Sequence, residues 1–151
     1  MAVPFLDTNI FIRYLTNDDP VHSPAALALV REIEKGSISV WTTELVVAEV
    51  VFILSNRRTY NLDREYISAV LLPILLLAGI SLANKNVYPR AFDLWVSVPH
   101  LSYVDAYHAA RIELEPEKFL YSFDTDFDKI PGLIRQEPQT PSNEPEKAGK
   151  P

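Results

Sequence analysis

Short apolar runs alternate along the chain with longer segments in which apolar residues recur about every three to four positions. Val3 to Leu6 forms the first run and predicts a strand, and the spacing of Ile10, Phe11 and Tyr14 directly after it predicts a helix. Similar runs predict strands at residues 37–42, 80–83 and 118–123, and helical patterns cover residues 24–35, 43–57, 63–78, 87–95 and 102–113. This alternation indicates an α/β sandwich around a mainly parallel sheet.

The last part of the chain has a different composition. Residues 136–151 hold four of the twelve prolines and no large apolar side chain, which predicts a disordered C-terminal tail. We therefore expect one folded domain at residues 1–135. The tail carries three glutamates and two lysines, so it contributes −1 to the net charge of −6, and the folded part holds the remaining −5.

One apolar segment raises the question of a membrane span. Residues 67–83 contain no charged side chain, but Pro73 and Gly79 interrupt the run, and a spanning helix needs about 20 apolar residues. We interpret this segment as a buried helix that stops near Gly79 and is followed by a short strand. No membrane association is expected.

Composition excludes several kinds of chemistry. The chain has no cysteine, which rules out disulfides and thiolate nucleophiles and suits a cytoplasmic protein. Its three histidines are too scattered for a metal motif, and it has neither a phosphate-binding glycine pattern nor the start of a signal peptide. The acidic net charge argues against a nucleic-acid binder, unless clustered acids hold divalent cations that invert the local field.

Two of the predicted strands end in an aspartate. Asp7 follows the first strand and Asp124 follows the run at residues 118–123. Ligands of open α/β sheets bind beyond the carboxyl ends of the strands, so both carboxylates would emerge at one edge if these strands are parallel neighbours. An alternative for Asp7 is that it only caps the helix that follows.

Two further acids lie in predicted helices. Glu49 is flanked by valines and its helical neighbours are apolar, so an ionised carboxylate there needs a metal or a distant arginine as partner. Asp105 lies three residues after Ser102, which fits a capping box, or else an aspartate that points from the helix start toward the strand ends. His108, one turn later, would assist the site or bond to backbone.

The aspartates at residues 124, 126 and 128 resemble the start of a calcium loop. Lys129 stands where that loop needs glycine, and no glutamate follows at the twelfth position, so an EF-hand is excluded and Asp126 remains a reserve ligand. Oxygen ligands without thiolates or clustered histidines suit Mg²⁺ or Mn²⁺. Asp7, Glu49, Asp105 and Asp124 are therefore candidate ligands of a metal site for phosphodiester hydrolysis.

Four segments in this order, "FLDTNIFIRYLTNDDP", "TTELVVAEVVFIL", "LSYVDAYHAARIE" and "LYSFDTDFDKIPG", resemble PIN-domain ribonucleases and most closely the VapC-type toxins of toxin–antitoxin pairs. The resemblance implies a three-layer α/β/α sandwich, a metal-dependent endoribonuclease that leaves a 3′-hydroxyl and a 5′-phosphate, an antitoxin partner and often a homodimer. By this likeness Asp7, Glu49 and Asp105 match the family's invariant acids and Asp124 its more variable fourth acid. Asn9 matches a polar residue that orients the site, and Ser122 stands in place of the usual threonine.

Two other functions remain open from the sequence. A metal-dependent phosphatase or deoxyribonuclease would use the same acids, although dehalogenase-type phosphatases need an aspartate where Asn9 stands. The second alternative is a non-catalytic interaction module of the same fold. Candidate contacts to RNA phosphates are the arginines, with Arg13 nearest the first motif and others at residues 57, 58, 64, 90 and 111.

Overall fold

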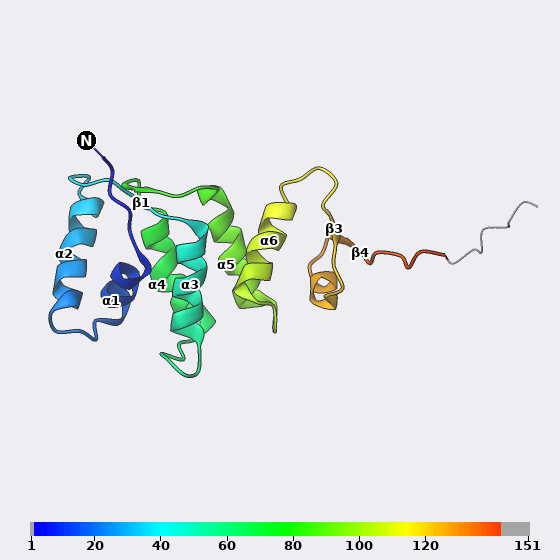
Figure 1. Cartoon of the computed structure of the whole chain (residues 1–151), viewed down its shortest axis with the longest axis horizontal. Helices are drawn as coiled ribbons and strands as arrows, with labels where there is room; N and C mark the ends of the chain where they lie inside the picture. Colours follow the sequence, from blue (N-terminus) through cyan, green and yellow to red (C-terminus); the bar gives the residue numbers. More distant parts are fainter. Residues whose placement is uncertain (1, 143–151) are drawn as a thin grey trace, which may run out of the picture.

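The computed structural model describes residues 2–142 and is a mixed α/β protein (Figure 1). Its elements follow in the order α1 (Thr8–Thr16), α2 (His22–Glu34), β1 (Val40–Trp41), α3 (Glu44–Ser55), α4 (Arg64–Leu75), β2 (Ile80–Ser81), η1 (Lys85–Val87), α5 (Tyr88–Ser97), α6 (Tyr103–Ile112), β3 (Phe119–Tyr121), η2 (Thr125–Lys129) and β4 (Ile134–Gln136). The predicted α/β class is confirmed, and the six predicted helical segments match α1 to α6 within a few residues.

The N-terminal sheet is parallel, as predicted. β1 pairs with β2, and Phe5 forms a parallel bridge to Trp41 on the other side of β1. The Leu6 amide donates to the Trp41 carbonyl at 2.8 Å and the Trp41 amide donates to the Pro4 carbonyl at 3.0 Å. Alternation along these strands buries Leu6, Val40 and Ile80 on one face and leaves Phe5 and Trp41, both 44% exposed, on the other.

Two predicted helices begin with a side-chain cap, of which the sequence indicates the one at Ser102. The Thr43 hydroxyl accepts a hydrogen bond from the Val46 amide and starts α3, and the Ser102 hydroxyl accepts one from the Asp105 amide and starts α6. α2 begins at His22, earlier than the expected Pro24, because the Asp19 carboxylate accepts the amides of Val21 and His22.

The apolar segment at residues 67–83 forms a helix and a short strand that each bury one face, while Leu76 is 44% exposed. Ile67, Leu71 and Leu75 lie fully buried on α4, and Ile80 in β2 is equally covered. Within residues 2–142, none of the helices combines the length and the apolar character that a membrane crossing requires.

The C-terminal part of the described chain forms a small unit of its own. β3 and β4 pair in parallel, with the Ser122 amide donating to the Gln136 carbonyl at 3.1 Å. The sequence analysis missed β4, and Gln136, expected to open the tail, is its last residue. Most of the predicted tail, residues 143–151, lies outside the described residues.

This unit does not extend the N-terminal sheet. β3 and β4 lie beyond α6, on the side away from β1 (Figure 1), and β3 pairs with β4 alone among the described strands. Phe127 and Ile130 of the unit are buried with the main core, which holds the unit in this place. The strands that end at Asp7 and Asp124 are therefore not neighbours within one chain.

A hydrogen-bonded network closes the C-terminal end of α1. Asp18 accepts hydrogen bonds from Tyr60 at 2.6 Å, Thr16 at 2.7 Å and Arg13 at 3.0 Å, and these bonds lower the pKa of Asp18 to about 2. The stabilisation is present above the unfolded pKa of about 4 and is lost as the pH falls from there toward 2. We expect the melting temperature of Asp18→Asn to depend less on pH than that of the wild type between about pH 4 and pH 2.

Candidate functional site

Asp7 lies at the junction of the first strand and α1. Its backbone is extended, with φ −86° and ψ 163°, which is the N-cap conformation that the sequence suggested. Its side chain, however, makes no cap hydrogen bond, and the residue is exposed. The carboxylate is thus free to bind something else, and the simple capping interpretation does not account for it.

The next residue connects this junction to α3. Thr8 is 4% exposed, and its hydroxyl donates to Glu49 Oε2 at 2.7 Å. The bond places the carboxylate of Glu49 beside the start of α1, one residue from Asp7. Asn9 follows on the exposed side of α1, where it lines a pocket toward α2 with Arg13 and His22.

Glu49 is exposed, which corrects the expectation that it lies on a buried apolar face. The buried side of α3 is formed by other residues, namely Val46, Val47, Val50, Val51 and Leu54. Its neighbours Leu45 and Phe52 are 82% and 64% exposed, because no described element covers that side of the helix. No ion pair to an arginine is present among the described residues, so that alternative for Glu49 is also not realised.

Asp105 is held by the serine half of the predicted capping box, and its carboxylate bonds to the Ser102 hydroxyl rather than to the Ser102 amide. Ser102 Oγ accepts from the Asp105 amide at 3.0 Å and donates to Asp105 Oδ2 at 2.8 Å. The carboxylate is half-buried in the first turn of α6 and has a second oxygen left for other partners. The cap and a functional role are therefore compatible for this residue. His108 is exposed and lines a pocket between α3 and α6.

Asp124 and Ser122 belong to the C-terminal unit. Ser122 Oγ accepts the Asp124 amide at 3.0 Å, and Asp124 Oδ1 accepts the Asp126 amide at 2.8 Å, so Asp124 caps η2. Asp126, the reserve ligand, is paired with Lys129 at 2.6 Å. Within residues 2–142, neither Asp124 nor Ser122 forms a hydrogen bond with Asp7.

The four candidate acids share an electrostatic property. Asp7, Glu49, Asp105 and Asp124 make no ion pair with any described residue, a property they share with Glu34, Glu44, Asp63, Glu65, Glu115 and Glu117, whereas seven acids pair with a lysine or an arginine: Asp18, Glu32, Asp93, Glu113, Asp126, Asp128 and Glu137. Uncompensated carboxylates with oxygen-only chemistry fit a hard divalent cation. In the described part of one chain, however, no three acids or histidines come together closely enough to hold a metal ion.

A second set of polar contacts fixes α6 against α3. The hydroxyl of Tyr107 donates to Glu44, and the Asn84 amide donates to the same oxygen at 2.9 Å. These bonds lower the pKa of Glu44, while burial and the bond to Glu44 raise the pKa of Tyr107 to about 12. Because Glu44 starts the helix that carries Glu49, the contact also sets the position of Asp105 relative to Glu49.

The arginines divide into two groups. Arg13 is paired with Asp18, Arg64 donates to the Trp95 carbonyl at 2.6 Å, and Arg90 forms two bonds of 2.8 Å to Glu113. Of the six arginines considered from the sequence, Arg57, Arg58 and Arg111 make no ion pair with a described residue and remain candidates for phosphate contacts. Arg13, the nearest candidate in sequence, is engaged within the fold.

Thr8 is the site residue that sequence reasoning missed. The sequence identifies it only as a possible cap, and its partner Glu49 lies 41 residues away. We expect Thr8→Val, which removes the donor at similar volume, to lower the activity of the site about 10-fold or more, since a hydrogen bond to a charged group contributes about 1.5–3 kcal/mol. Thr8→Ser keeps the donor and should retain most of the activity. Equal loss in both variants would contradict this role.

Comparison with known families gives the class of the protein. The sequence matches the family described as "PIN domain" over residues 5–133, from the first strand to just before β4. The chain therefore belongs to the PIN domain family, whose members are generally nucleases. No curated protein and no solved structure matches the chain in the other two comparisons.

Proposed function

We propose that the chain is a cytoplasmic endoribonuclease that depends on Mg²⁺ or Mn²⁺ and acts as the toxin of a toxin–antitoxin pair. The observation that carries the proposal is the free carboxylate of Asp7, one residue before Thr8, whose hydroxyl holds the carboxylate of Glu49. Neither acid has a basic partner among the described residues, and oxygen ligands of this kind suit a divalent cation.

In this proposal Asp7, Glu49, Asp105 and Asp124 hold the metal. A cation held by these residues would lower the pKa of a bound water and would neutralise charge on the phosphodiester. Thr8 orients Glu49, Ser102 orients Asp105 and Ser122 orients the backbone of Asp124 through the hydrogen bonds described above. Asn9, exposed next to this group, is proposed to position the site or the substrate.

The RNA and protein partners are proposed from the surface around these acids. Arg57, Arg58 and Arg111 are available for the RNA backbone. Leu45, Phe52 and Val104 form an exposed apolar patch across α3 and α6, with Val104 47% exposed. An apolar patch beside a charged site suits a protein partner such as the antitoxin. Replacing Phe52 with serine is expected to weaken a co-expressed antitoxin complex without unfolding the chain.

The test is RNA cleavage by the purified wild type with and without divalent cations. We expect cleavage with Mg²⁺ or Mn²⁺, products with a 3′-hydroxyl and a 5′-phosphate, and loss of cleavage after chelation that returns when metal is added back. Glu49→Gln should lack this activity, and Glu65→Gln, an exposed glutamate on α4, should keep it. Cleavage that persists in chelator would contradict the metal-dependent mechanism.

A second candidate function is a PIN-fold module that binds RNA or protein without cutting. It is favoured because, in the described part of one chain, no three acids or histidines come together closely enough to hold a metal ion. RNA binding without any cleavage in Mg²⁺ or Mn²⁺ would support this alternative over the nuclease.

A further inference from the structure

Two strand edges of this chain lack a hydrogen-bonding partner among the described residues. In the segment at residues 3–6, the Leu6 amide and the Pro4 carbonyl face β1, so the amide and carbonyl of Phe5 point to the opposite edge. In β3, the Lys118 carbonyl and the Ser122 amide face β4, so the backbone groups of Phe119 and Tyr121 point outward. Neither outward edge forms a backbone bond within residues 2–142.

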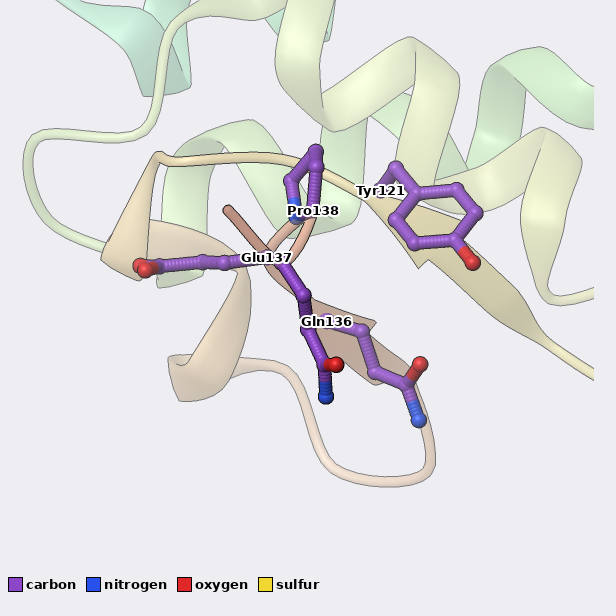
Figure 2. Close-up of a pocket in the computed structure, with 5 residues that line it drawn as sticks. Tyr121, Gln136, Glu137 and Pro138 are labelled. Carbon is purple, nitrogen blue, oxygen red and sulfur yellow. The ribbon is translucent and has the colours of Figure 1, made fainter. Parts of the chain in front are cut away.

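Both edges also expose large apolar side chains. Val3 and Phe5 are 50% and 44% exposed at the first edge, and Tyr121 and Phe123 are 65% and 73% exposed at the second. Figure 2 shows Tyr121 beside Gln136, Glu137 and Pro138 around an open pocket of this unit. Free strand edges with apolar side chains pair readily with another strand.

The two edges of one chain are held apart. Only six residues connect α6 to β3, and Glu113 at their start is bound to Arg90 of α5 by two bonds of 2.8 Å. Phe127 and Ile130 are buried with the main core, and α6 lies between the unit and β1 (Figure 1). The free edge of residues 3–6 is thus accessible to the same unit of another molecule.

We propose that two copies of the chain form a symmetric dimer in which β3 of one copy pairs in parallel with residues 3–6 of the other, and that Asp124 reaches Asp7 across this contact. The role of Asp124 rests on the proposed nuclease function. Every strand pair in the structure is parallel, and parallel pairing brings both carboxyl ends to one edge. A reciprocal exchange closes the dimer and leaves both edges paired.

The backbone pattern restricts the register. In a parallel pair, a residue that bonds the partner strand with its amide and carbonyl lies opposite a residue whose amide and carbonyl point away from it. Phe5 must therefore lie opposite a residue of the other copy whose backbone groups face β4, which is Leu120 or Ser122. Pairing Phe5 with Ser122 sets Asp124 opposite Asp7, at the strand spacing of about 4.8 Å. In this register Val3 lies beside Leu120, and Phe119 and Tyr121 continue the face of Leu6, so apolar side chains on both edges gain neighbours.

The absence of native cysteine allows a direct test by cross-linking. Chains carrying Val3→Cys and chains carrying Leu120→Cys, with different tags, are co-expressed and oxidised. Opposite positions on adjacent strands lie within the Cα separation that a disulfide needs. We expect a mixed disulfide dimer well above the yield with Leu45→Cys, a control on the 82% exposed position of α3.

Two outcomes overturn the proposal. The first is a mixed cross-link no stronger than the Leu45→Cys control. The second is a chain with both Val3→Cys and Leu120→Cys that closes its disulfide within a monomer. If Leu120→Cys does not fold, the mass of the wild type in solution tests the proposal instead. A dimer of about twice 17.1 kDa is expected, and a monomer contradicts the proposal.

Activity then tests the shared site separately. Co-expressed Asp7→Asn and Asp124→Asn chains should recover about a quarter of wild-type cleavage, since half of randomly paired dimers are mixed and each holds one intact site. If the cross-link forms but the wild type cleaves no RNA, the strand exchange is supported and the proposed nuclease function is contradicted. If the wild type cleaves RNA but the co-expressed Asp7→Asn and Asp124→Asn chains do not, Asp124 of the partner copy does not contribute to the site.

Discussion

Asp7→Asn is expected to lower metal-dependent RNA cleavage by at least about a hundredfold. The expectation follows because a bound metal supplies several kcal/mol of transition-state stabilisation, and each 1.4 kcal/mol corresponds to about tenfold in rate. Stability should change by less than about 0.5 kcal/mol, since the carboxylate is exposed and makes no cap hydrogen bond. Initial cleavage rates and a thermal melt on the same preparation check both parts.

Asp63→Asn is the matched control for this substitution. Asp63 also stands at an N-cap, that of α4, with an extended backbone, an exposed side chain and no cap hydrogen bond. The residue after it, Arg64, donates to the Trp95 carbonyl, whereas Thr8 after Asp7 donates to Glu49. We expect Asp63→Asn to keep wild-type activity, and an equal loss in both variants, or an unfolded Asp7→Asn, would show that Asp7 has a structural role.

Leu54→Ala is expected to destabilise the protein by about 2–5 kcal/mol, the usual cost of truncating a fully buried leucine. Leu54 is 0% exposed and lies on the buried side of α3, the helix that carries Glu49. In a chain of 151 residues, this corresponds to a fall in melting temperature of about 5–20 °C. The unfolding midpoint in urea and the thermal melt provide the measurement.

Leu45→Ala is the matched control, because it makes the same leucine-to-alanine change at an exposed position of the same helix. Leu45 is 82% exposed, so truncation leaves no cavity, and we expect a change within about 0.5 kcal/mol. If Leu45→Ala destabilises as strongly as Leu54→Ala, the exposed side of α3 is covered in solution, which is what a partner on the Leu45, Phe52 and Val104 patch would produce.

Local features of this fold were predictable because they depend on neighbours in the sequence. The extended segment before Asp7, which forms one parallel bridge at Phe5, the cap at Ser102 and the six helices follow from apolar spacing and side-chain chemistry within a few residues. The segment before Gly79 was also interpreted correctly as a helix with a buried face, since α4 ends at Leu75 and buries Ile67, Leu71 and Leu75.

The predictions that were wrong concern contacts between segments distant in the sequence. α3 is apolar on several sides, so its pattern cannot tell which side is covered, and Glu49 was wrongly placed on a buried face. β4 has three residues, two of them polar, and gives no strand pattern of its own. The order of strands is equally non-local, which is why the expected neighbourhood of Asp7 and Asp124 is not found within one chain.

Binding of Mn²⁺, measured by calorimetry on the wild type and on Asp7→Asn/Asp105→Asn, tests the metal site most directly. The protein should be free of antitoxin and folded, at a concentration where the dimer is populated. We predict binding by the wild type and none by the double variant. A folded wild type that binds no Mn²⁺ contradicts the account and leaves the acids as helix caps on a PIN-fold binding module.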